Sequence, residues 1–150
     1  MTEETLQTRL ARAEELIDLR HRVLRAGHPR ESAHFAGDDE LTTQHVAVIT
    51  PDGTIVGCGT LVLNTWQDNP AWQLRGMAVD ERYRAKGVGT LVLAALEAAV
   101  RDDATLPRQL WCNARTPAVG FYKKQGWEVV SEQFFIETAG PHFRMTRTLE

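Results

Sequence analysis

The stretch that decides the fold is QLRGMAV (residues 73–79), followed by DERYRAK (80–86) and by GVGT (87–90), which opens a long apolar run. The first segment predicts a strand, the second a polar, basic turn, and the third the start of a helix. Apolar residues then recur on one face of a helix with 3.6 residues per turn: Val88, Leu91, Val92, Ala95, Leu96 and Ala99. We expect this helix to lie buried against a sheet.

The turn before this helix has the composition of an anion-binding site. The first N–H groups of a helix have no partner within it, and the helix dipole places partial positive charge there. Gly87 and Gly89 allow a ligand to approach the backbone, and Arg84 and Lys86 add cationic side chains. A phosphate or pyrophosphate cradle is therefore predicted. The alternative is a surface turn that is merely basic.

Composition narrows the class of protein. The chain has 150 residues and a formal net charge of −3, so we expect one domain spanning residues 1–150 and no basic field for nucleic acid. No apolar run reaches the length of a membrane span, and the first residues lack a signal region, so a cytoplasmic protein is expected. Cys58 and Cys112 are too few for a metal site by spacing, and we expect buried, reduced thiols and no metal.

The remaining elements are predicted from periodicity and turn residues, in the order β-α-β-β-β-α-β-α-β-β. Pro117 is the expected first residue of a helix that Thr116 caps and Gly126 ends. Gly57 and Gly59 predict a bulge or a close backbone approach within a strand. Besides the core helix, the expected strands are 6–10, 44–50, 54–63, 71–79, 109–113, 127–137 and 142–149, and the expected helices are 12–26 and 116–125.

Two segments are predicted to be loops, residues 30–43 and residues 64–70. The first has no periodicity and carries five titratable side chains: Glu31, His34, Asp38, Asp39 and Glu40. Loops of this length in compact domains are often functional. One interpretation is that its acids border an acceptor pocket and attract a cationic amine; the alternative is that these charges are only solvated.

Several motifs, taken in order, resemble one family over essentially the whole chain. They are Arg84-x-x-Gly87-x-Gly89 between a strand and a helix, a strand ending at Asn113, and Phe121-Tyr122-Lys-Lys-Gln-Gly126-Trp127. This pattern is similar to that of the GCN5-related N-acetyltransferases. The resemblance implies an α/β fold with a mixed, mostly antiparallel sheet, a splayed central strand pair and flanking helices, known as the acyl-CoA N-acyltransferase fold.

The resemblance also implies a binding site for acetyl-CoA. Backbone groups of Met77, Ala78 and Val79 would pair with the pantetheine arm like an added strand. The pyrophosphate would lie on the N–H groups of five successive residues, with Arg84 as its ion partner: Lys86, Gly87, Val88, Gly89 and Thr90. Asn113 would reach the cofactor or the acceptor from the other side of the splay, unless it only satisfies local backbone.

Tyr122 is the predicted general acid. Acetyl transfer from a thioester to an amine passes through a tetrahedral intermediate and expels a thiolate, which a nearby tyrosine hydroxyl can protonate. An unperturbed tyrosine has a pKa of about 10 and keeps its proton at neutral pH. Without the flanking motif, Tyr122 would instead be interpreted as a core aromatic beside Val119 and Phe121.

The base that takes the proton of the amine is not fixed by the sequence. His142 is the foremost candidate because it lies in Gly140-Pro-His-x-x-Met145, which resembles a motif of the small bacterial members. A lone histidine is otherwise more often structural. Glu137, His34, Glu31 and a water relay are the alternatives, and the Val79 N–H is a candidate oxyanion donor.

Together these features predict an acetyl-CoA-dependent N-acetyltransferase that acts by direct transfer in a ternary complex. Its partner is expected to be a small-molecule or peptide amine, with a homodimer possible in principle. Two other classes stay open: a non-catalytic acyl-CoA-binding or sensing module of the same fold, and a phosphate-binding protein that uses only the Gly87 turn. Ala85 occupies a position where the family often has Gly, and it should be tolerated there if its φ is negative.

Overall fold

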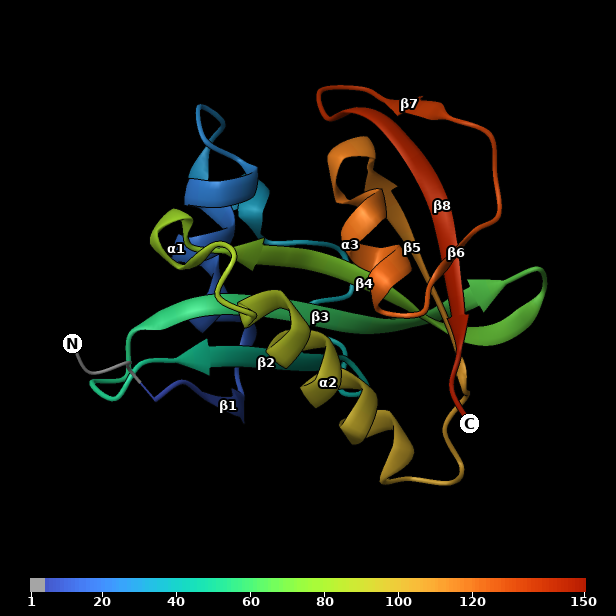
Figure 1. The fold of residues 1–150 in the computed structure, drawn as a ribbon, viewed down its shortest axis with the longest axis horizontal. Coiled ribbons are helices and arrows are strands. Elements are labelled where there is room, and N and C mark those ends of the chain that lie inside the picture. Colours follow the sequence, from blue (N-terminus) through green and yellow to red (C-terminus); the bar gives the residue numbers. More distant parts are fainter. Residues whose placement is uncertain (1–4) are drawn as a thin grey trace.

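The computed structural model describes residues 5–150, which build a mixed sheet flanked by helices (Figure 1). The sheet has eight strands in the order β1-β2-β3-β4-β5-β8-β6, and β7 pairs with β8. All neighbours are antiparallel except β4 and β5. The strands are β1 Gln7–Leu10, β2 Gln44–Ile49, β3 Ile55–Trp66, β4 Asn69–Val79, β5 Gln109–Arg115, β6 Glu128–Val129, β7 Phe134–Ile136 and β8 Gly140–Thr148.

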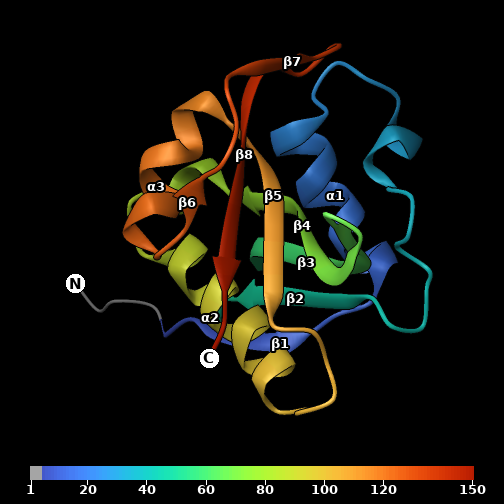
Figure 2. The ribbon, with the colours of Figure 1, turned by 90° about the vertical axis from the view of Figure 1, so that its right-hand side faces the viewer.

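Helices cover both faces of this sheet (Figures 1 and 2). The α-helices are α1 Ala13–Leu24, α2 Val88–Arg101 and α3 Val119–Lys124, and short 3-10 helices occur at Arg30–Ala33, Glu81–Tyr83 and Thr116–Ala118. Among the described residues, none of these helices is long and apolar enough to span a bilayer.

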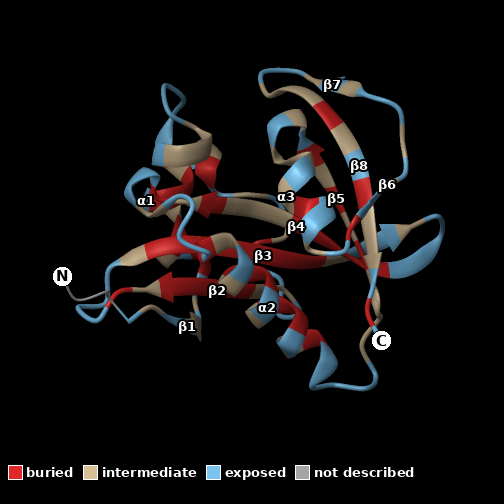
Figure 3. Cartoon of the chain, viewed as in Figure 1, coloured by how far each residue is buried: buried red, intermediate tan, exposed pale blue. Residues whose placement is uncertain are grey.

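Alternation along the strands sorts the core into two layers. Val46 and Val48 of β2 pack with α2 in the main cluster, whereas Ala47 between them packs with Leu16 and Leu19 of α1. This is the two-residue period of a strand that is buried on both faces. In Figure 3, buried residues accordingly follow the central strands and the inner side of α2.

The close approach predicted at Gly57 and Gly59 is present. A Cβ atom on Gly57 would overlap Val88 of α2, and one on Gly59 would lie 2.6 Å from Cγ1 of Val92. These glycines therefore let the core helix lie directly on β3. The strand register also shifts between Cys58 and Thr60, which is the irregularity expected of a bulge.

The central strand pair is splayed, as the sequence predicted. β4 and β5 pair in parallel over only three residues each, residues 72–74 of β4 opposite residues 110–112 of β5. Beyond Leu74, β4 keeps its partner β3 but pairs with no described strand on the β5 side, and the two strands diverge in Figure 1. Gly76, two residues past the last pair with β5, has a φ of +64° in the left-handed region and lies at the register shift between β4 and β3.

The prediction of a loop at residues 64–70 is wrong. β3 and β4 continue as a hairpin to Trp66 and Asn69, joined by Gln67 and Asp68, which both have positive φ. Such two-residue turns usually contain Asn-Gly or Asp-Gly, and Gln67-Asp68 is neither, so this turn was not predicted. The ring of Trp66 packs against Trp111, with 5.5 Å between centroids, and supports the extended hairpin.

Other boundaries differ from the prediction near the C-terminus. Residues 127–137 form two short strands, β6 and β7, because residues 130–133 between them are not in a strand, although the Val130 N–H still donates to the Arg144 carbonyl of β8. Thr116 does not cap a helix, since it is the first residue of a 3-10 turn and its hydroxyl donates to the Pro141 carbonyl. Gly126 ends α3 with a φ of +91°, as expected.

Candidate active site

A cavity of about 1170 Å³ opens where β4 and β5 separate. Its walls come from both faces of the sheet: α2 and α3 on one side, α1 and residues 34–36 on the other. The volume suits a cofactor-sized ligand together with a small second molecule. We call the wall formed by α2, α3 and their preceding turns the donor side, and the wall formed by α1, residues 34–36 and the facing residues of β4, β5 and β8 the acceptor side.

The donor side contains the predicted anion cradle. The first N–H bonded within α2 is that of Leu91, which donates to Gly87 at 3.1 Å, so the N–H groups before it have no intrahelical partner. Gly87 precedes the helix with a φ of +80°, a conformation that other residues adopt only with strain. Four predicted residues of the turn line the cavity: Gly87, Val88, Gly89 and Thr90.

The two cations of the turn lie differently. Arg84 lines the cavity, and its guanidinium has no carboxylate partner among residues 5–150. Lys86 does not line it; its ammonium lies 5.2 Å from the centroid of the Tyr83 ring. The geometry therefore brings only Arg84 to the cradle itself.

Ala85 has a φ of +62°, so the condition under which an alanine is tolerated there without strain is not met. The left-handed conformation brings the Cβ of an L-residue close to its own carbonyl oxygen, which is why glycine is preferred at such positions. Ala85 is followed two residues later by Gly87, also in this region. The turn therefore carries backbone strain at its alanine.

The splayed edge of β4 forms the floor of the donor side. Met77 and Val79 line the cavity, but the side chain of Ala78 points away and packs in the second core cluster beneath α1. No described strand pairs with this part of β4 on the β5 side. An extended ligand could pair with the backbone there, as a further strand would.

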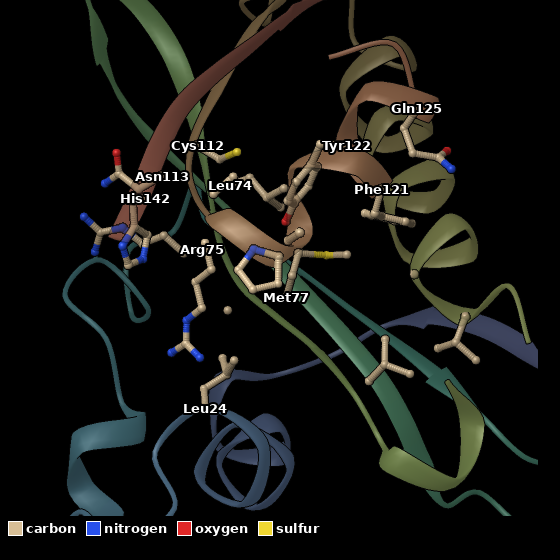
Figure 4. Close-up of a pocket in the computed structure, with 18 of the residues that line it drawn as sticks. Leu24, Leu74, Arg75, Met77, Cys112, Asn113, Phe121, Tyr122, Gln125 and His142 are labelled. Atoms are coloured by element: carbon tan, nitrogen blue, oxygen red, sulfur yellow. The ribbon is translucent and has the colours of Figure 1, made fainter. Parts of the chain in front are cut away.

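Tyr122 comes from α3 and reaches the same space. Its ring packs between Phe121 and Trp127, with centroids at 5.3 and 5.4 Å. Figure 4 shows the hydroxyl directed into the cavity, near Met77. Burial, with a smaller contribution from Cys112, raises the pKa of Tyr122 above its ordinary value. The phenol therefore keeps its proton and can act as a donor.

Both cysteines are buried and free. Cys112 lines the cavity close to Tyr122, and burial raises the pKa of its thiol to about 12. Burial does the same to Cys58, to about 12. A thiol that stays protonated at neutral pH is a poor nucleophile, so Cys112 serves as an apolar wall.

Strand register places one set of polar side chains on the acceptor side. Gln73 pairs with Trp111 across β4 and β5, and Arg115 pairs with His142 across β5 and β8. Since alternate residues share a face, Asn113 lies on this face as well and lines the cavity. Its carboxamide oxygen is buried and has no hydrogen-bond partner among the described residues.

His142 is the best placed of the four candidate bases. Its Nδ1 lies 2.8 Å from the Gly140 carbonyl oxygen, which can only accept, so Nδ1 carries the proton. In the neutral ring, Nε2 is then left with a lone pair, as a base requires. His34 also lines the cavity but pairs with Asp39 at 3.2 Å, whereas Glu31 and Glu137 do not line it.

The interpretation that residues 30–43 border the acceptor pocket with their acids holds for the segment but not for the acids. Residues 34–36 do border the cavity, but no Asp or Glu of residues 5–150 lines it. Asp38 is instead buried and paired with Arg20 at 2.6 Å. The acceptor side presents cations, and sequence reasoning missed three of them: Arg25, Arg75 and Arg115. Arg75 and Arg115 line one cavity only because of the fold, since β4 and β5 no longer pair at Arg75.

Comparisons with known proteins agree with this architecture. The profile of the Acetyltransferase (GNAT) family matches residues 11–127. The chain is 30% identical to the uncharacterized N-acetyltransferase YitI of Bacillus subtilis, over 96% of this chain and 97% of that protein. The chain therefore belongs to the GNAT family of acetyltransferases.

Solved structures show the same fold at lower identity. Escherichia coli ElaA superposes with a TM-score of 0.75 at 18% identity, covering 95% of this chain and 99% of that one. An aminoglycoside 6'-N-acetyltransferase complexed with coenzyme A gives a TM-score of 0.70 at 16% identity, covering 91% and 89%. The acyl-CoA N-acyltransferase fold predicted from the sequence is thereby confirmed.

Proposed function

We propose that this protein transfers an acetyl group from acetyl-CoA to a primary amine, directly and within a ternary complex. The observation that carries the proposal is the single cavity at the splay, which is lined from both faces of the sheet. A donor and an acceptor entering from opposite faces would meet there. The sheet runs through nearly all of the described chain, which supports one N-acetyltransferase domain over residues 1–150.

The residues of the donor side fit coenzyme A. The N–H groups at the start of α2 have no intrahelical partner, and Arg84 has no carboxylate partner among residues 5–150, so both suit a pyrophosphate. The free edge of β4 at Met77 and Val79 suits the amide-containing pantetheine arm. When bound, acetyl-CoA supplies the acetyl thioester, and the coenzyme A complex of the aminoglycoside acetyltransferase with the same fold supports this choice.

The proton transfers fall to two side chains of this protein. His142 takes a proton from the ammonium or the attacking amine at Nε2, which its Nδ1–H bond to Gly140 leaves free. Tyr122 gives its hydroxyl proton to the sulfur that leaves as the new C–N bond forms and the C–S bond breaks. The neutral thiol of Cys112 argues against an acyl-enzyme route.

The test is release of coenzyme A thiol from acetyl-CoA across a panel of amines, with wild type beside Tyr122→Phe. We expect amine-dependent release that falls at least about tenfold in the variant, while the Kd for acetyl-CoA is unchanged. Tight binding without release for any amine would overturn the enzyme and favour the sensing module. ADP binding as tightly as coenzyme A would favour a phosphate-binding protein.

A further inference from the structure

The acceptor side of the cavity is cationic. Three arginines from three different elements line it: Arg25 at the end of α1, Arg75 of β4 and Arg115 at the end of β5. None of the three forms an ion pair with a carboxylate among residues 5–150. They lie apart from Arg84, which belongs to the donor side across the sheet.

Arg75 has the hydrogen-bonding capacity for a ligand. Its guanidinium donates to the Ala36 carbonyl and to Gln73 Oε1, both at 3.0 Å, which uses two of its five N–H groups. These two bonds hold the group in place. Figure 4 shows it extending into the cavity below His142. The remaining donors suit an oxyanion, which guanidinium binds with paired hydrogen bonds.

The acids that could neutralise this wall are used elsewhere. Asp38 accepts from Arg20 and from the Phe35 N–H, and it is buried away from the cavity. Asp39 pairs with His34 on the outside of residues 34–40. The acidic segment 31–40 therefore contributes only His34, Phe35 and Ala36 to the acceptor side.

This charge has two consequences for an incoming amine. Nearby cations disfavour the ammonium and so favour the neutral, nucleophilic amine. The same repulsion opposes the binding of an amine whose only charge is positive. An acceptor with an anionic group of its own offsets that repulsion and still delivers a readily deprotonated amine to His142.

Resting on the function proposed above, we propose that the acceptor is a primary amine that also carries an oxyanion, a carboxylate or a phosphate, held by Arg75 with support from Arg115. A simple diamine, polyamine or aminoglycoside-like cation is the wrong class for this wall. The oxyanion end would lie on the β4 side, and the amine would point toward His142 and the splay.

The experiment compares matched amines in the thiol-release assay. Each carboxylate is paired with its decarboxylated counterpart, L-phenylalanine with 2-phenylethylamine and β-alanine with ethylamine, and 2-aminoethyl phosphate forms the phosphate arm. Wild type is run beside Arg75→Gln. Arg144→Gln is the control, because Arg144 shares this sheet face but is exposed, lies over Phe134 and does not line the cavity.

We expect kcat/KM for at least one amine that carries a carboxylate to exceed kcat/KM for its decarboxylated counterpart about 10- to 100-fold. Arg75→Gln should remove most of this preference by raising KM for the amine, with KM for acetyl-CoA unchanged, and Arg144→Gln should keep it. Acetylation of the decarboxylated amines as efficiently as of the anionic ones would overturn the inference while the proposed function stood. If none of the tested amines supports thiol release, both the inference and the proposed function are overturned.

Discussion

The two sides of the cavity differ in how they are built and in how far the sequence reveals them. Most of the donor side is continuous in sequence: one strand edge, one turn and one helix start lie within residues 77–90, and α3 adds Phe121 and Tyr122. The acceptor side is assembled from α1, residues 34–36, β4, β5 and β8, which only the fold brings together. Under the proposed function, the local half would bind acetyl-CoA and the assembled half would select the acceptor.

The electrostatics of the two sides also differ in origin. On the donor side, backbone N–H groups and the side chains of Arg84 and Lys124 provide the positive potential. On the acceptor side, side chains alone provide it, and two of them donate to carbonyls of residues 30–40: Arg25 to Ser32 and Arg75 to Ala36. The variants below alter one side at a time.

The largest effect is expected from breaking the pair that anchors the acceptor wall. Asp38→Asn removes the charge that faces Arg20 at 2.6 Å, where both side chains are fully buried. An uncompensated buried guanidinium should lower the free energy of unfolding by about 3–5 kcal/mol, measured by urea unfolding. The double variant Arg20→Met/Asp38→Leu should lose much less. A loss equal to that of Asp38→Asn would contradict the role of the pair.

The same residue predicts a pH dependence of stability. Burial opposes ionisation of Asp38, but hydrogen bonds from Arg20 and the Phe35 N–H outweigh it and lower its pKa below the ordinary 3.8. A lowered folded-state pKa contributes stability that is present above pH 3.8 and is lost as the pH falls through the folded-state value. Urea midpoints measured below about pH 4 should therefore fall more steeply in wild type than in Asp38→Asn. Parallel curves would contradict the assignment.

The next effect concerns the base. His142→Gln should lower kcat for the best amine about 100-fold, since a positioned base contributes about that much, and leave the Kd for acetyl-CoA unchanged. His34→Gln is the comparison, because His34 also lines the cavity but is tied to Asp39. An equal or larger fall in kcat for His34→Gln would move the assignment to that residue.

The smallest effect is expected in the turn of the donor side. Ala85→Gly relieves a non-glycine residue at a φ of +62° and should raise the free energy of unfolding by about 1 kcal/mol. Gly87→Ala, at a φ of +80°, should lower it by a similar amount. Thermal unfolding checks both. Destabilisation by Ala85→Gly would show that the turn is not strained at this residue.

These differences explain how much of the molecule could be predicted from sequence. Helix α2 and its Gly87 start were predictable because periodicity, glycine placement and basic residues agree within a short stretch. The hairpin at Gln67 and Asp68 was not, because its residues are not those that usually form such turns. The division of residues 127–137 into two strands follows from pairing with β8, which no local pattern encodes.

The acceptor side was the least predictable part of the site. The acids of residues 31–40 suggested attraction for a cation. Asp38, however, is already paired with Arg20 of α1, which lies 18 residues away in sequence. Arg75 lies within residues 73–79, which were predicted to form a strand, but its exposure to the cavity depends on the divergence of β4 and β5. Charge counts along a loop do not reveal which charges are already paired.

The most direct test of the central claim, that donor and acceptor bind on opposite faces of the sheet, is a calorimetric titration of acetyl-CoA into three proteins: wild type, Arg84→Gln and Arg75→Gln. Each variant removes a different cavity-lining guanidinium. We predict that Arg84→Gln weakens acetyl-CoA binding about tenfold and that Arg75→Gln leaves it within about twofold of wild type. Weakening by Arg75→Gln as large as that by Arg84→Gln would contradict the division of the cavity into two sides.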